Sequence, residues 1–284
     1  MSERAIVRLR HNKISLALHE LRAGAGRPLL HLHGLGERSP AEVPAHLASW
    51  PGPVWALDLA GHGDSDVAVG AGYFCEVLMG DVDTALAHLG PVTVFGRGLG
   101  AYIGLLTAGG RPELVRGTIC FDGPGLAGGG PWPAAPYIPF AVDPAPPGGT
   151  PDPWAVFELT RDVRPPDYAA SFTRQATARS GLDLAVAVAG VNRPPWLDAV
   201  VAEPGVIECT VVGALARVAA GGSSGVRRGS GVAPGAAPPV ITSPKPLRHN
   251  QAPASANSAS HSNAATREMA RARCASSALV LTDR

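Results

Sequence analysis

Short apolar runs alternate with amphipathic stretches through the first 125 residues, and this alternation restricts the chain to few folds. Strands covered on both faces are nearly continuous apolar runs, whereas a covering helix repeats its apolar residues every three to four positions. Segments 5–10 and 13–21 are close together and roughly alternating, which predicts an antiparallel pair that opens the sheet. Further strands are expected at 28–33, 53–58, 91–96 and 116–122, with helices at 41–50, 72–89 and 98–109.

Strands that alternate with helices in this order build one architecture. The connections between parallel strands are right-handed crossovers, and the helices then cover both faces of the sheet. We therefore expect an α/β fold with a mostly parallel, doubly wound sheet.

Residues 123–180 interrupt the rhythm. They are rich in Pro and Gly, as in GPGLAGGGPWPAAPYIP from Gly123, and the predicted helices are confined to 152–162 and 167–179. We interpret this stretch as a short cap insertion that covers one end of the sheet. The run at 182–190 then returns to the sheet, and a helix is expected near 195–203.

The composition changes again towards the C-terminus. From Val211 onwards there are nine Lys or Arg and two Asp or Glu, and no aromatic residue follows Trp196. Ordering a residue costs about 1–2 kcal/mol of backbone entropy. This segment has too few large apolar side chains for their burial to offset that cost. We expect residues 1–217 to form the folded domain and residues 218–284 to be a low-complexity, disordered tail. A more specific hypothesis is that this tail is the product of a shifted reading frame and not a selected sequence.

Charge and cysteine content narrow the class of protein. The net charge is +1, which favours neither nucleic acid nor a membrane surface as a partner. The start is too polar for a signal peptide, and no apolar run reaches the length of about 18 residues that a membrane helix needs. The four cysteines lie far apart without metal-type spacing, so we expect a cytoplasmic protein with no metal site and no cofactor.

Three Gly-rich loops each follow a predicted parallel strand, and ligands bind outside the carboxyl ends of such strands. The first loop holds His33, Gly34 and Leu35. Because glycines let the backbone turn sharply and present its N–H groups, the Leu35 N–H is a candidate donor in an oxyanion hole. The alternative is an ordinary Gly-rich turn. His33 is also a weak candidate for proton transfer.

The second loop, DLAGHGDS from Asp58 to Ser65, follows the run at 53–58. With the His-Gly pair after the preceding strand, it resembles the α/β-hydrolase family. The resemblance covers about residues 13–125 and fades through 126–212. It implies the α/β-hydrolase fold, in which this motif is mainly structural, so we expect His62 to stabilise its loop.

The third loop, from Gly96 to Gly100, lies where the resemblance places the nucleophile elbow, G-x-S-x-G. The elbow needs a serine, cysteine or aspartate at the tip of a strained turn, but the tip here is Gly98. Glycine has no side chain and tolerates positive φ, so the nucleophile position is vacant. The Leu99 N–H still faces an anion-friendly pocket, and with the Leu35 N–H it is a candidate site for a carbonyl, carboxylate or phosphate oxygen.

The resemblance further implies an acid after the sixth or seventh strand and a histidine after the eighth. Asp122 is the candidate acid, and a turn role in FDGPG is the equal alternative. No histidine occurs between His88 and His249, and both His249 and His261 fall in the expected tail. The base is therefore missing or unsupported.

Three interpretations of function follow from these residues. The favoured one is a hydrolase-fold protein that has lost acyl transfer, because Gly98 replaces the nucleophile, and that binds a small, partly apolar ligand in a cleft. The second is a hydrolase or lyase that acts on a small ester or carbonyl compound by non-covalent acid/base chemistry through Asp122 or His33. The third is a truncated or frame-shifted, inactive relic. None of them specifies an oligomeric state.

Overall fold

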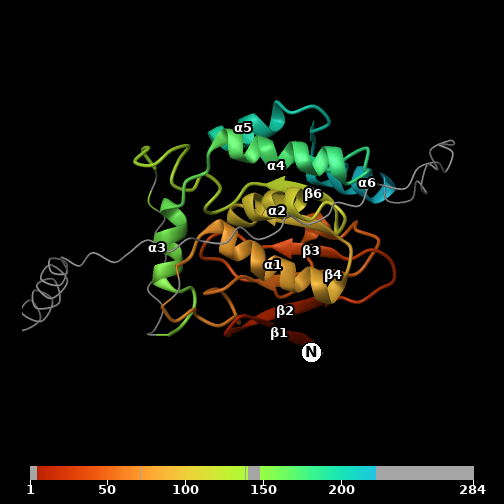
Figure 1. The fold of residues 1–284 in the computed structure, drawn as a ribbon. Helices are drawn as coiled ribbons and strands as arrows, with labels where there is room; N and C mark the ends of the chain where they lie inside the picture. Colours follow the sequence, from red (N-terminus) through yellow and green to blue (C-terminus); the bar gives the residue numbers. More distant parts are fainter. Residues whose placement is uncertain (1–4, 71, 138, 140–147, 222–284) are drawn as a thin grey trace, which may run out of the picture. The chain divides into compact units, whose positions relative to one another are not determined.

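The computed structural model describes residues 5–70, 72–137, 139 and 148–221, and these form a layered α/β structure (Figure 1). Eight strands make one sheet in the order β1-β2-β4-β3-β5-β6-β7-β8. The strands are β1 (Ile6–His11), β2 (Ile14–Arg22), β3 (Leu29–Leu32), β4 (Val54–Asp58), β5 (Val92–Arg97), β6 (Val115–Phe121), β7 (Val186–Val188) and β8 (Ile207–Glu208).

The sheet is antiparallel at one edge and parallel elsewhere. β2 pairs antiparallel with both β1 and β4, whereas every pair from β4 to β8 is parallel. β1 therefore runs in the same direction as β4, and both end at the edge of the sheet where the loops after the parallel strands lie. The expected antiparallel opening and the mostly parallel sheet are confirmed.

Helices cover both faces of the sheet. They are η1 (Ala45–Leu47), α1 (Cys75–Leu89), α2 (Leu99–Gly110), α3 (Pro153–Arg161), α4 (Pro166–Arg179), α5 (Pro195–Val201) and α6 (Val211–Gly221). β3 shows how alternate residues separate the two cores: Leu30 and Leu32 lie in the core that α1 and α2 cover, and Leu29 lies in the core under η1 and α6.

Part of the expected cap belongs to the helical layer. α4 lies beside α2, and α5 lies beside α4 (Figure 1). These contacts make α4 the crossover helix between β6 and β7, as right-handed parallel connections require. The insertion that departs from the layered pattern is therefore shorter than 123–180, and among the described residues its helix is α3.

Two expected elements are much shorter than the sequence pattern suggests. The helix expected at 41–50 is the single turn η1, and the strand expected at 182–190 is the three-residue β7. α6 continues through the boundary expected at residue 217, and the rest of the predicted tail, residues 222–284, lies outside the described residues. Within the described part of the chain, no helix is both long and apolar enough to cross a membrane.

Candidate functional site

The turn between β5 and α2 is made by one residue. β5 ends at Arg97 and α2 begins at Leu99, so Gly98 alone connects them. Gly98 has φ 56° and ψ −116°, a conformation that L side chains rarely adopt. Its N–H donates to the Phe121 carbonyl at 3.0 Å, which ties the turn to the end of β6. The sharp strand-to-helix turn is thus present, with a glycine at its tip.

Two backbone donors beside this turn share one acceptor. The N–H groups of Leu35 and Leu99 both donate to the carbonyl oxygen of Pro124, at 3.0 and 2.9 Å. Two N–H groups at such distances from one oxygen form the arrangement that stabilises an oxyanion in acyl transfer. Here the oxygen that they hold belongs to the protein's own backbone.

The Pro124 oxygen also fills the space beside Gly98. A Cβ atom built on Gly98 would lie 2.1 Å from that oxygen and 2.6 Å from the carbonyl carbon of Gly123. Both separations are far below van der Waals contact. Any residue with a side chain at position 98 therefore requires the backbone at 123–124 to move.

Arg97 holds the loop after β6 against the loop after β3. Its Nε donates to Glu37 Oε2 at 2.9 Å, and its Nη1 donates to the Asp122 carbonyl at 3.0 Å. The same Glu37 carboxylate accepts the Gly34 N–H at 2.9 Å. Arg97 and Glu37 thus connect the two segments that carry Leu35 and Pro124. This connection holds the Leu35 N–H close to the Pro124 carbonyl.

Both ring nitrogens of His33 are engaged by the backbone. Its Nδ1–H donates to the Gly34 carbonyl at 2.8 Å, and its Nε2 accepts the Leu59 N–H at 3.1 Å. The ring is fully buried, and burial lowers its pKa. His33 consequently joins the loop after β3 to the loop after β4 as a neutral imidazole, and neither nitrogen is available to a ligand.

His62 lies against His33, with ring centroids 5.0 Å apart. Its Nδ1–H donates to the Ala60 carbonyl at 3.0 Å, within its own loop. Burial is the largest cause that lowers the pKa of His62 to about 3, so the ring is neutral at ordinary pH. This arrangement agrees with a loop-stabilising histidine.

One group in the described residues has the composition of a metal site: His19, Asp58 and Asp64, whose ligand atoms lie within 4.8 Å of one another. His19 Nε2 lies 2.8 Å from Asp58 Oδ2, and the N–H groups of Ser39 and Asp64 donate to the same carboxylate at 2.6 and 2.8 Å. These donors already use the carboxylate oxygens, so the group fits a hydrogen-bonded junction better than a cation site.

Asp122 lies at the carboxyl end of β6, where the sequence places it. Its carboxylate accepts the N–H groups of Val191 and Asn192 at 2.7 and 3.1 Å. It therefore holds the loop after β7, and within the described residues no histidine contacts it. This geometry supports the structural alternative for Asp122.

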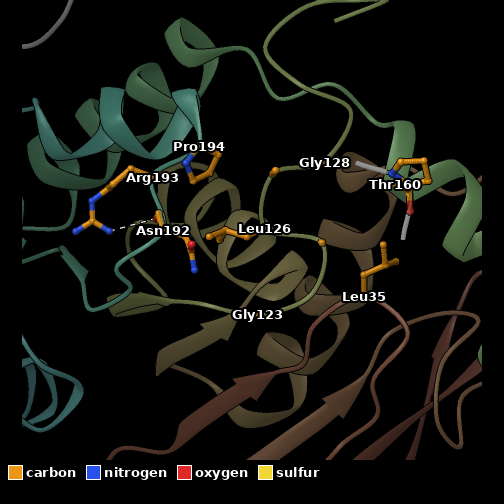
Figure 2. Close-up of a pocket in the computed structure, with 11 residues that line it drawn as sticks. Leu35, Gly123, Leu126, Gly128, Thr160, Asn192, Arg193 and Pro194 are labelled. Carbon is orange, nitrogen blue, oxygen red and sulfur yellow. Dashed lines mark hydrogen bonds between the residues drawn. The ribbon is translucent and has the colours of Figure 1, made fainter. Parts of the chain in front are cut away.

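A cavity of about 420 Å³ opens beside the Pro124 loop (Figure 2). Its wall includes Leu35 after β3, residues 123 and 125–128 after β6, Thr160 of α3, and residues 192–194 after β7. Figure 2 shows the Arg193 side chain extending away from Leu35 and Thr160, and its guanidinium pairs with Glu208 of β8. Asn192 is exposed, and among the described residues no hydrogen bond of its side-chain amide is found. The cavity lining is thus mainly apolar, and its polar side chains are those of Thr160, Asn192 and Arg193.

No sequence signal marks Pro124 or Arg97, the two residues that determine this site. Every residue carries a carbonyl, so no residue type marks the one that enters a pair of N–H donors. Arg97 lies beside the tip of the turn, and the sequence indicates no partner for it. Its pairing with Glu37 spans 60 positions and has no sequence spacing that would reveal it.

No protein-family model matches the chain, and no curated protein matches it. Solved structures do match in fold. A deformylase of N-formylmaleamic acid from Pseudomonas putida has 15% identity, a TM-score of 0.53 and coverage of 72% of this chain and 92% of that chain. A thioesterase domain from the curacin biosynthetic pathway has 17% identity, a TM-score of 0.51 and coverage of 77% and 98%. With the strand order above, these likenesses show that the chain has the α/β-hydrolase fold.

A local likeness to another hydrolase is more limited. The epoxide hydrolase of Vigna radiata is 26% identical over 49% of this chain, with a TM-score of 0.38. The match spans only 41% of that enzyme, about two fifths of its length. Its activity therefore says nothing direct about this chain.

Proposed function

We propose that this α/β-hydrolase-fold protein carries out no acyl transfer and instead binds a small, partly apolar ligand in the cavity beside the Pro124 loop. The observation that carries the proposal is the Pro124 carbonyl oxygen, which occupies both N–H donors that an ester carbonyl would need. A substrate carbonyl cannot displace it without moving residues 123–125.

The vacant turn supports the same conclusion. Gly98 supplies no hydroxyl, thiol or carboxylate, and the volume that such a group would occupy is filled by backbone. Removing the nucleophile from a catalytic triad lowers turnover by about a million-fold, and the residual rate depends largely on an open oxyanion hole. With that hole filled, we expect no residual rate.

The lack of a candidate base beside the turn, among the described residues, is a further support. His33 has both nitrogens in backbone hydrogen bonds, and no histidine follows His88 before His249. In the described residues after β7 and β8, therefore, no imidazole is available to deprotonate a nucleophile or a water molecule. This argues against the non-covalent acid/base alternative at this site.

Reactivity towards a fluorophosphonate probe tests the catalytic half of the proposal. The full chain should remain unlabelled, and hydrolysis of p-nitrophenyl acetate should equal the buffer background. An active serine esterase assayed beside it verifies the reagents. Labelling of a serine in the cleft, or saturable turnover, would contradict the proposal.

Ligand binding is tested by thermal shift with a library of small, partly apolar compounds. Compounds that raise the Tm should lose their effect in Asn192→Trp, which fills the cavity entrance. The matched control is Val212→Trp, because Val212 is 58% exposed on α6 and lies outside the cavity lining. Equal Tm shifts in both variants would mean that the ligand binds elsewhere.

We also propose a cytoplasmic location without a nucleic acid, membrane or cofactor partner. Cys75, Cys120 and Cys209 are free thiols, which is typical of a reducing compartment. Cell fractionation followed by immunodetection should recover the protein with cytosolic markers. Recovery in a membrane or extracellular fraction would contradict this assignment.

A further inference from the structure

A second and larger cavity, of about 830 Å³, lies at the same edge of the sheet but beside the antiparallel strands. It opens between the β1–β2 turn, the segment after β4 and helix α1, which packs against β1. No lining residue is shared with the first cavity. Much of its wall is apolar: Ile14, Val67, Ala68, Tyr73 and Val77.

A histidine and a carboxylate line this cavity together. His11, the last residue of β1, has its Nδ1 2.6 Å from Asp81 Oδ1 on α1. Asp81 is fully buried, and its other oxygen accepts the Ala60 N–H at 2.9 Å. The His11 side chain is 19% exposed, so the pair has one buried member and one member that reaches solvent.

The position of the His11 ring depends on Gly80, the neighbour of Asp81. A Cβ atom on Gly80 would lie 2.6 Å from His11 Cε1 and 2.8 Å from Nε2. Only a residue without a side chain lets the imidazole lie this close to α1. The ring is therefore fixed by a hydrogen bond on one side and by close packing on the other.

The carboxylate fixes the tautomer of His11. An ionised carboxylate only accepts hydrogen bonds, so His11 Nδ1 carries the proton and Nε2 is an acceptor in the neutral ring. The donor to Nε2 is the side-chain amide Nδ2 of the adjacent Asn12, at 3.1 Å. Asn12 is exposed, so its amide can exchange this bond for water at little cost.

We propose that this cavity binds a small, mainly apolar molecule bearing one hydroxyl group, which donates its hydrogen bond to His11 Nε2 in place of Asn12. Asp81 is a positioning residue that orients the ring. Besides the Asp81 carboxylate, which is occupied by hydrogen bonds with His11 and Ala60, the cavity presents one cationic and one anionic side chain, Lys13 and Asp66, whose charges offset each other. A neutral ligand therefore fits better than an anion or a cation. The inference is independent of the function proposed for the first cavity.

β-Naphthol and its methyl ether test this inference, because they share one apolar body and differ in the O–H donor. β-Naphthol should bind to the full chain saturably. Its affinity should exceed that of the ether by about fivefold or more, as one added hydrogen bond predicts. In His11→Phe, which keeps an aromatic ring but no acceptor, the two affinities should agree within about twofold. Intrinsic ligand fluorescence measures both.

Two further variants locate the binding. Val77→Trp fills the cavity and should abolish binding of both compounds; circular dichroism verifies its fold, and Ala68→Phe serves if it does not fold. Asn192→Trp, at the first cavity, should leave both affinities unchanged. The inference is overturned if neither compound binds, if His11→Phe retains the fivefold preference, or if only Asn192→Trp abolishes binding.

Discussion

The carbonyl oxygen of Pro124 occupies the position beside Gly98 where a side chain would begin, 2.1 Å from the Cβ that any other residue would carry. The same oxygen accepts the N–H groups of Leu35 and Leu99. The space beside Gly98 and the hydrogen bonds of both leucine N–H groups are therefore filled by one backbone oxygen. A chain with serine at position 98 must hold its loop after β6 elsewhere, and only then are the two N–H donors open to a substrate.

Replacing Gly98 by alanine should destabilise the fold by more than backbone strain alone. Strain at a positive φ costs about 1–3 kcal/mol, and the clash with Pro124 adds to it. Gly26→Ala is the matched control, because Gly26 has φ 95° and a Cβ there meets nothing within 4 Å. Urea unfolding measures both variants, and equal losses would mean that the Pro124 loop does not lie against residue 98.

Arg97→Ala should loosen the Pro124 loop, because the guanidinium bridges Glu37 and the Asp122 carbonyl. We expect a loss of about 1 kcal/mol in unfolding free energy, together with faster proteolysis at residues 123–130. Arg111→Ala removes an exposed pair with Asp83 and should cost less than about 0.5 kcal/mol. Identical behaviour of the two variants would argue against the bridging role of Arg97.

Asp122 is expected to act on stability through the loop after β7. Alanine removes both acceptors for the N–H groups of Val191 and Asn192 and should cost about 1–3 kcal/mol. Asparagine retains one acceptor oxygen, so Asp122→Asn should lie between alanine and the parent protein. Chemical denaturation gives the order of stability of the three proteins. If Asp122→Ala leaves the free energy of unfolding unchanged, the carboxylate does not hold the loop.

Because buried histidines resist protonation in the folded protein, we expect the fold to lose stability in mild acid. Burial is the largest cause that lowers the pKa of His31 to about 3, from an ordinary value of 6.5. The unfolded chain then takes up the proton first, so the contribution is complete above about pH 6.5 and is lost as the pH falls towards about 3.

Within that window, each such imidazole should lower the free energy of unfolding by up to about 1.4 kcal/mol for each unit by which the pH falls. Urea unfolding at several pH values gives the slope. In His31→Phe, which keeps an aromatic ring beside Phe95, the slope should fall by that amount. A slope that does not change would show that His31 already titrates normally in the folded protein.

Much of the fold follows from the sequence because strand and helix periodicities are local signals. The loops after β3, β4 and β5 were found from their glycines, and these loops do lie at one edge of the sheet. The short elements were overestimated: the run at 182–190 is as apolar as a full strand, but only Val186–Val188 pairs with β6. Pairing partners, rather than composition, set that length.

The site was predicted less completely, for a physical reason. Leu35 and Leu99 were identified as donors from the turns that carry them, but their acceptor is a main-chain oxygen with no sequence signature. The pairing of His11 with Asp81 likewise joins residues 70 positions apart and depends on how α1 lies against β1. Such contacts become visible only when the packing of the elements is known.

Amide hydrogen exchange of Leu35 and Leu99, resolved by residue with NMR, tests the central claim most directly. N–H groups that donate to Pro124 should exchange as slowly as the amides of β3 and β5, because opening them requires the loop after β6 to move. Donors of an open oxyanion hole would instead face water in the cleft. Rapid exchange at both leucines, with β3 and β5 still protected, would contradict the account.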